Sequence, residues 1–149
     1  MPAIHTKTIK IDETSIDVHN HVNNQEYLKW MQEIAIEHSS LQGWPMQRYL
    51  DGQVSWFVKS HFIEYVSPAL LGDVLLAHTW VATMERRISQ RRTVFMRERD
   101  NQVVARAKTD WIFVNLKTGR VLVIPHEVGS AFELVENEEE VFEKIGLKT

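Results

Sequence analysis

The hydrophobic period of the sequence changes near residue 53, from that of a long helix to that of strands, and this change limits the folds that the chain can adopt. Before it, mostly apolar side chains recur every three or four residues, as they do along one face of an amphipathic helix. We predict a helix from about Asn24 to Gln42, ended by Gly43, which suits a left-handed cap, and by Pro45. The predicted buried face consists of Tyr27, Trp30, Met31, Ile34, Ala35, His38 and Leu41.

From residue 53 onward the period is two, which is typical of strands. Strand candidates are residues 54–65, 74–85, 88–99 and 103–113, with short strands at 4–11 and 121–124 and a helical tail from His126. Leu28 and Ile36 extend the apolar surface of the helix over more than half its circumference, which suits burial by a curved sheet. We therefore predict an α+β fold, a long curved antiparallel sheet wrapped around a central amphipathic helix, in a single domain of residues 1–149.

The composition of the chain excludes several classes of function. The net charge is −3, whereas nucleic-acid-binding proteins usually show a basic excess, so we expect no nucleic-acid partner. The sequence has no cysteine, which excludes disulfides, thiolate nucleophiles and cysteine-ligated zinc. No apolar segment has the length of a signal-peptide core or of a membrane span. We therefore expect a cytoplasmic protein without membrane contact.

The segment from Asp17 to Asn24, DVHNHVNN, concentrates polar side chains just before the predicted helix. His19 and His21 have a spacing that places two side chains on the same side of a strand, where they could bind a metal. A third ligand would have to come from a carboxylate or from a histidine distant in the sequence. Because this loop lacks the sustained alternation of a strand, we expect no metal site.

The helix start offers a second kind of chemistry. Asn23 is a good N-cap, and Glu26 stands at the spacing of a capping box. The first-turn amides of Asn24, Gln25 and Glu26 lack acceptors within the helix and lie at the positive end of its dipole. One of them could polarise a carbonyl oxygen. The alternative is a well-capped helix with no further role.

Asp17 precedes these amides by a short loop. A carboxylate near a helix N-terminus is stabilised as the anion, so it should stay ionised at neutral pH. Together with amide donors it would supply the two halves of acyl transfer, attack on a carbonyl or activation of water and stabilisation of the oxyanion. Asp17 could equally be an ordinary turn-capping residue. Residue types alone leave both interpretations open.

The residues from Asp17 to Tyr27, D-V-H-N-H-V-N-N-Q-E-Y, resemble the D-x-x-G-H-V-N-N-x-x-Y signature of the hot-dog-fold acyl-CoA thioesterases, the relatives of 4-hydroxybenzoyl-CoA thioesterase. Residues 62–81 and 107–125 are also similar to segments of this family. The resemblance implies a hot-dog fold and homo-oligomers, dimers or tetramers, formed by edge-to-edge strand pairing. Asn20 stands where the family has glycine, and asparagine is one of the few residues that tolerate a left-handed backbone.

The resemblance also implies roles for single residues. Asp17 matches the catalytic carboxylate, which acts as nucleophile or general base, and Asn24 matches the position whose backbone amide polarises the thioester carbonyl. Asn23 and Tyr27 match positions that shape the site, and we expect His21 to line it.

Further along the chain, Arg86 and Arg87 are placed like paired basic residues that hold coenzyme A phosphates in some relatives, although they could equally form a solvated hairpin turn. Some branches of the fold place a catalytic glutamate on the helix. Here Glu33 and Glu37 lie on its polar face and are the weaker candidates.

The sequence therefore predicts an acyl-CoA thioesterase that hydrolyses an acyl thioester of coenzyme A or of acyl carrier protein to a free acid and a thiol. Coenzyme A is then part of the substrate, and we expect no other cofactor. One alternative is a hydratase or dehydratase of the same fold, but its usual Asn-Pro-x-His motif is absent. A second alternative is a non-catalytic acyl-CoA-binding module.

Overall fold

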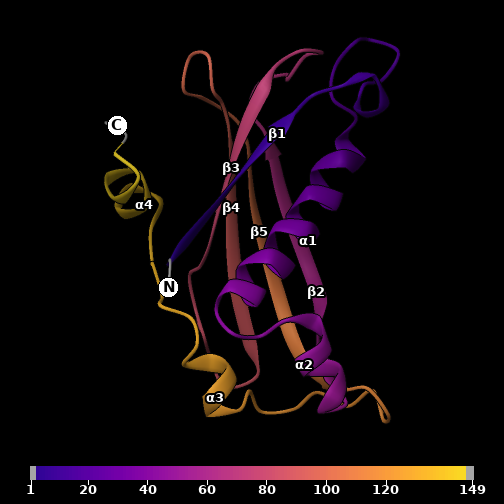
Figure 1. Cartoon of the computed structure of the whole chain (residues 1–149), viewed down its shortest axis with the longest axis vertical. Helices are drawn as coiled ribbons and strands as arrows, with labels where there is room; N and C mark the ends of the chain where they lie inside the picture. Colours follow the sequence, from indigo (N-terminus) through magenta and orange to yellow (C-terminus); the bar gives the residue numbers. More distant parts are fainter. Residues whose placement is uncertain (1–2, 147–149) are drawn as a thin grey trace.

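A five-stranded antiparallel sheet forms the centre of the molecule, and one long helix lies along one of its faces (Figure 1). The structure, a computed structural model, describes residues 3–146, so the predicted domain of residues 1–149 extends beyond the described part at both ends. The strand order is β1-β3-β4-β5-β2. The elements are β1 (Ile4–Lys10), the 3-10 helix η1 (Glu13–Ser15), α1 (Asn24–Leu41), α2 (Met46–Asp51), β2 (Val54–Tyr65), β3 (Val74–Val81), β4 (Ile88–Arg97), β5 (Gln102–Asn115), α3 (His126–Gly129) and α4 (Glu138–Lys144).

This arrangement confirms the predicted α+β class and most of the predicted elements. The helix α1 ends one residue before the predicted Gln42, and Gly43 has the expected left-handed backbone, with φ +93°. The strand β2 has the predicted bounds, whereas β3 and β4 end earlier than predicted. The short helix α2 was not predicted, because Pro45 was interpreted only as the end of α1 and it is also the N-cap of α2.

The predicted strand at residues 121–124 is wrong. Only Val121 forms an isolated bridge there, with Val114. The amide of Ile124 instead donates to the carbonyl oxygen of Arg86 at 2.8 Å, which directs the chain across the end of the sheet toward α3. The tail that follows contains two short helices, α3 and α4, rather than one continuous helix.

The amphipathic face of α1 packs onto the inner face of the sheet. Tyr27, Trp30, Met31 and Ile34 join residues of the strands in the main core cluster. Leu41 is the exception to the predicted buried face, because 48% of it is exposed. Burying such a face stabilises the fold by about 25 cal/mol per Å² of apolar surface removed from water.

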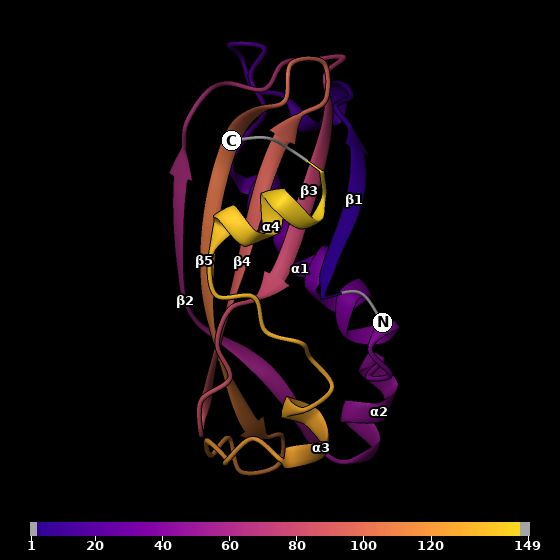
Figure 2. The same cartoon turned by 90° about the vertical axis from the view of Figure 1, so that its left-hand side faces the viewer.

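The outer face of the sheet is covered in part by α4, which crosses β3 and β4 (Figure 2). Val141 and Phe142 of α4 pack against Trp80, Val94 and Met96. Asn137 caps this helix through a hydrogen bond from the amide of Glu140. Arg106 of β5 also contacts α4, because its Nε lies 2.8 Å from Oε1 of Glu138.

The strand β2 has no partner on its outer edge among the described residues. It is twelve residues long, and Phe57, Phe62 and Tyr65 on it are 48%, 64% and 45% exposed. A long edge with apolar side chains is a template for pairing with another strand. Within residues 3–146, no helix has both the length and the apolar character needed to cross a membrane.

Candidate functional site

The loop between β1 and α1 is folded around Asp17. Its carboxylate oxygen Oδ1 accepts hydrogen bonds from the amides of His19 and His21, at 2.8 and 3.2 Å. Its own amide donates to the carbonyl oxygen of His21 at 2.8 Å. Asn20 completes the turn with φ 62°, so the left-handed backbone expected at this position is confirmed. The loop therefore needs no glycine there.

These hydrogen bonds set the charge of Asp17. The amide of His19 lowers the pKa of the Asp17 carboxyl below its ordinary value of 3.8, and the amide of His21 and the two imidazoles act in the same direction. Desolvation opposes the shift, but it does not outweigh the hydrogen bond from the amide of His19. The carboxylate is ionised at neutral pH, as predicted. The largest cause is the amide of His19 in its own loop.

The start of α1 leaves one amide without an acceptor. The side chain of Asn23 accepts from the amide of Gln25 at 3.1 Å, which confirms Asn23 as the N-cap. The amide of Glu26 donates to the carbonyl oxygen of Asn23 at 2.9 Å. Among the described residues no acceptor pairs with the amide of Asn24. Of the three first-turn donors, Asn24 alone remains available for a ligand oxygen.

The predicted capping box is wrong. The amide of Asn23 donates to the carbonyl oxygen of Ser15 at 2.8 Å and not to the side chain of Glu26. This bond and the antiparallel bridge between Ile16 and Val22 close the loop on itself. The amide of Val22 also donates to the carbonyl oxygen of Ala69 at 2.9 Å. The loop that carries Asp17 is thus fastened both to the helix start and to the segment before β3.

Tyr27 lies one turn into α1, with its ring in the core. The ring makes edge contacts with Trp30 and Phe95, at centroid distances of 5.4 and 5.0 Å, and a tilted contact with Tyr65. Burial raises the pKa of Tyr27 to about 12, so the phenol stays protonated at neutral pH. Tyr27 is placed to fix the helix start against the sheet rather than to exchange protons.

The structure does not bring Arg86 and Arg87 to Asp17 within one chain. Both arginines are exposed in the connection between β3 and β4, at the end of the sheet beside α3. The loop of Asp17 lies at the opposite end (Figure 1). The carboxylates of Glu33 and Glu37 form ion pairs with Lys7 of β1, at 3.7 and 3.2 Å, so neither glutamate is placed at the Asp17 loop.

His19 and His21 were considered as metal ligands. Their imidazoles are exposed, and only their backbone amides contact Asp17 in hydrogen bonds. Across the described residues, no group of three histidine, aspartate or glutamate side chains is arranged to hold a metal ion.

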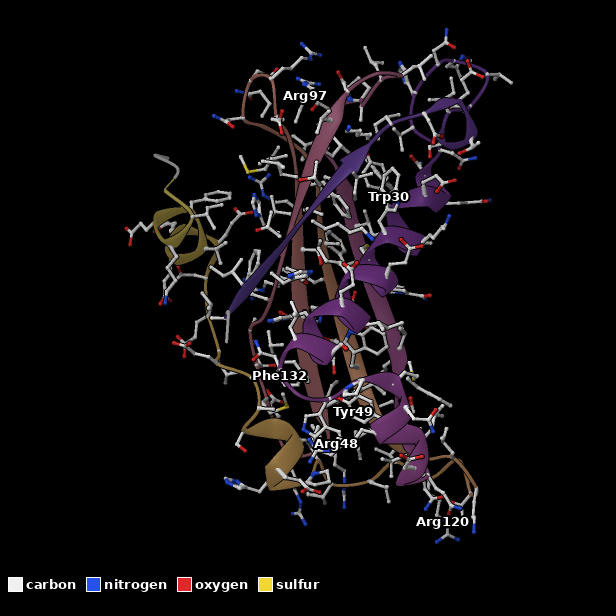
Figure 3. All side chains as sticks on the ribbon, viewed as in Figure 1. Trp30, Arg48, Tyr49, Arg97, Arg120 and Phe132 are labelled. Atoms are coloured by element: carbon white, nitrogen blue, oxygen red, sulfur yellow. The ribbon has the colours of Figure 1, made fainter. Side chains whose placement is uncertain are left out.

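A cavity of about 480 Å³ lies between the C-terminal half of α1, α2 and the strands β2, β4 and β5. Its walls are largely apolar, and their aromatic residues include Trp44, Tyr49, Trp56, Trp111 and Phe132. Figure 3 shows Tyr49 and Phe132 toward the α3 end of the molecule, while Trp30 lies nearer the start of α1. A cavity of this size and character suits a small apolar ligand.

One charged residue also lines this cavity, and the sequence reasoning missed it. Arg91 on β4 is 93% buried, because only 7% of it is exposed. Period two places Arg91 and Arg92 on opposite faces of the strand, but each face of β4 mixes polar and apolar residues. The alternation therefore does not indicate which of the two arginines is buried.

Comparison with known proteins gives consistent matches. Residues 12–132 match the family described as the thioesterase-like superfamily. The long-chain acyl-CoA thioesterase FadM of Escherichia coli strain K12 is 27% identical over 128 residues, which are 84% of this chain and 94% of that protein.

Solved structures match over similar lengths. YbaW, a probable thioesterase from Escherichia coli, is similar with a TM-score of 0.74 and 26% identity, over 85% of this chain and 94% of that one. A 1,4-dihydroxy-2-naphthoyl-CoA thioesterase from Synechocystis has a TM-score of 0.78 and 18% identity, over 86% of this chain and 94% of that one. At this lower identity the likeness concerns the fold.

Proposed function

Because the chain belongs to the thioesterase-like superfamily, and has the hot-dog fold predicted from its sequence, we propose that it hydrolyses an acyl thioester to a free acid and a thiol. The observation that carries this proposal is the presence of an ionised carboxylate and an unpaired amide at the two ends of one hydrogen-bonded loop. Asp17 acts as general base or nucleophile, and the amide of Asn24 polarises the thioester carbonyl. His21 and Asn23 hold these two groups in place through their backbone and cap hydrogen bonds.

As a general base, Asp17 takes a proton from water while the resulting hydroxide attacks the thioester carbonyl carbon. The amide of Asn24 donates to the oxygen that becomes negative, which is the step at which such a donor contributes most. The carbon–sulfur bond then breaks, and the thiolate leaves and takes up a proton. As a nucleophile, Asp17 instead attacks the carbonyl carbon itself; the carbon–sulfur bond breaks, the thiolate leaves and takes up a proton, and water hydrolyses the resulting mixed anhydride to the free acid and the Asp17 carboxylate in a second step.

The substrate class proposed is an acyl thioester of coenzyme A or of acyl carrier protein. The matched relatives named above act on, or are named for, thioesters, and FadM is named for long-chain acyl-CoA. The cavity beside α1 suits the acyl group, because most of its wall surface is apolar.

The activity is tested by measuring free thiol released from acyl-CoAs that differ in acyl length and in aromatic or linear character. We expect release with at least one of them, and the same rate after a chelator is added. If none of them releases thiol, the proposal fails. Loss of the activity on chelation, with recovery on adding a divalent metal, would show that the histidines of the loop bind a metal after all.

We also propose that two subunits pair through the outer edges of their β2 strands. The length of β2 and its exposed Phe57, Phe62 and Tyr65 support this. Two-fold pairing of antiparallel strands sets the β3–β4 connection of one subunit at the same end as the Asp17 loop of the other. Arg86 and Arg87 would then be available to the phosphates of a substrate bound at the partner's loop.

Light scattering on the purified protein is expected to give two or four times the mass of one chain. Hydrogen exchange then separates edge pairing from other interfaces. Pairing predicts protection of the alternate β2 amides that do not donate to β5, because each gains an acceptor in the partner. A monomer, or an oligomer in which these amides exchange freely, would contradict the proposed interface.

A further inference from the structure

Arg91 carries a buried charge that no acid in the described chain balances. No carboxylate of residues 3–146 lies within 4.0 Å of its nitrogens. Its hydrogen bonds run from Nη1 to Nδ1 of His38 at 2.9 Å and to Oγ1 of Thr79 at 3.2 Å. The ring of Phe132 lies 5.9 Å from the guanidinium carbon.

Both hydrogen-bond partners of Arg91 are acceptors without a negative charge. A guanidinium only donates, so Nδ1 of His38 accepts and carries no proton. Burial lowers the pKa of Arg91 to about 10, so the side chain is still a cation at neutral pH. A buried cation is costly unless an anion compensates it, and proteins rarely bury arginine unpaired. The position of Arg91 therefore suggests that a ligand supplies the anion.

The cavity itself shows where that anion would lie. Several of its other polar groups already have partners: the hydroxyl of Tyr49 contacts Ser39 and Trp56 at 2.9 and 3.1 Å, and Ser89 donates to the carbonyl oxygen of Thr83. By contrast, Nε and Nη2 of Arg91 have no hydrogen-bond partner among the described residues.

Trp111 is another residue that lines the cavity, and its buried indole donor Nε1 has no acceptor among the described residues. In the β4–β5 register Arg91 is opposite Thr109, so Trp111 lies two residues along the neighbouring strand on the same face. A buried guanidinium that lacks an anionic partner, in a largely apolar cavity, matches a carboxylate at the end of an apolar group.

The length of α1 separates the guanidinium of Arg91 from the Asn24 amide of the same chain. Asn24 and His38, the partner of Arg91, are fourteen residues apart in the helix, which is roughly 21 Å at about 1.5 Å per residue. Arg91 therefore does not contact the carbonyl that the Asn24 amide of the same chain would polarise. For a substrate held by the Asn24 amide of the same chain, Arg91 would meet a part of the ligand remote from the thioester.

We propose that the cavity binds an acyl group that carries a carboxylate remote from the thioester, and that Arg91 pairs with this carboxylate. The preferred substrates are then half-thioesters of dicarboxylic acids rather than plain fatty acyl thioesters. This inference rests on the proposed thioesterase function for its substrate, but the binding of the carboxylate can be measured without any hydrolysis.

The test uses thioether analogues of acyl-CoA, in which a CH₂ group replaces the thioester carbonyl, so that binding is separated from turnover. Pairs of equal chain length end in a methyl group or in a carboxylate, and several lengths are compared. Trp44, Trp56 and Trp111 line the cavity, so tryptophan fluorescence reports occupancy. At the best length we expect the carboxylate analogue to bind about tenfold or more tightly than its methyl partner, as for a charge-assisted pair.

Three variants locate the effect. Arg91→Met is expected to abolish or reverse the carboxylate preference, and Arg91→Lys, which keeps the charge without the planar fork, to retain part of it. Arg92→Met is the matched control, because it removes the same charge from the neighbouring residue on the other face of β4 and should keep the preference. If Arg91→Met does not fold, the weaker preference in Arg91→Lys decides the question.

Equal binding of both analogues by the wild type would overturn the inference. So would an Arg91→Met variant that weakens both analogues equally, because Arg91 would then act on a part common to every substrate. Thiol release from the corresponding thioesters is measured separately. Release without a carboxylate preference leaves the thioesterase function intact, and a carboxylate preference without release leaves the inference intact.

Discussion

Asp17→Asn is expected to lower kcat for thioester hydrolysis by roughly 10²- to 10⁴-fold, the usual contribution of a positioned general base. An asparagine side chain keeps an oxygen that can accept from the amides of His19 and His21, so the loop should retain its shape. Only the negative charge and the basicity are lost. The measurement is steady-state thiol release from the best acyl-CoA, with circular dichroism to verify that the fold is unchanged.

The same loop region offers a matched control. Asp12 is also an exposed aspartate whose pKa is lowered by hydrogen bonds to a neighbouring residue, in this case Thr14. Asp12→Asn should therefore leave kcat unchanged. If both substitutions reduce the rate equally, or if Asp17→Asn leaves it unchanged, Asp17 is not the base or nucleophile, although the thioesterase activity itself would stand.

The pH dependence provides an independent readout of Asp17. Since the loop amides lower its pKa below 3.8, the active carboxylate form persists as the pH falls and is lost only below that value. The free energy of unfolding changes in the same direction. The native state favours the Asp17 anion, so the stability that the anion contributes is lost as the pH falls through the folded pKa. We expect kcat/KM to show no Asp17 titration near neutrality. An acid limb near pH 6 would indicate a histidine instead.

Asn24→Pro removes the backbone amide that we propose as the oxyanion donor, and it should do so without breaking the helix. Asn24 is the first residue of α1, where proline is favoured because that amide has no partner within the helix. The preceding Asn23 has φ −64° and ψ 131°, a conformation that a residue before proline readily adopts. We expect kcat to fall roughly 10²- to 10³-fold with little change in melting temperature.

Asn24→Ala is the comparison that separates amide from side chain. It removes the side chain and keeps the amide, so kcat should be close to that of the wild type. A large loss in both variants would indicate that the side chain of Asn24, not its amide, is required. Wild-type activity in a folded Asn24→Pro variant would exclude this amide as the donor.

The sequence predicted the local features of the candidate site because these depend on residues close together in the chain. The N-cap at Asn23 and the left-handed backbone at Asn20 follow from what single side chains can do for their own backbone. The capping box failed for the opposite reason. The amide of Asn23 donates to the carbonyl oxygen of Ser15. Nothing in the spacing from Asn23 to Glu26 shows that the preceding loop returns to the helix start.

By itself, the sequence determined the main helix, the period-two strands and the loop that joins an acid to a helix start, because hydrophobic period and capping act within a few residues. Only the tertiary structure decided the strand order, the α1–α2 cavity and the burial of Arg91. Arg91 contacts His38, 53 residues away, and Thr79 on the neighbouring strand. Which of two adjacent arginines is buried depends on the strands and helix that surround it, and these surroundings exist only once the chain has folded.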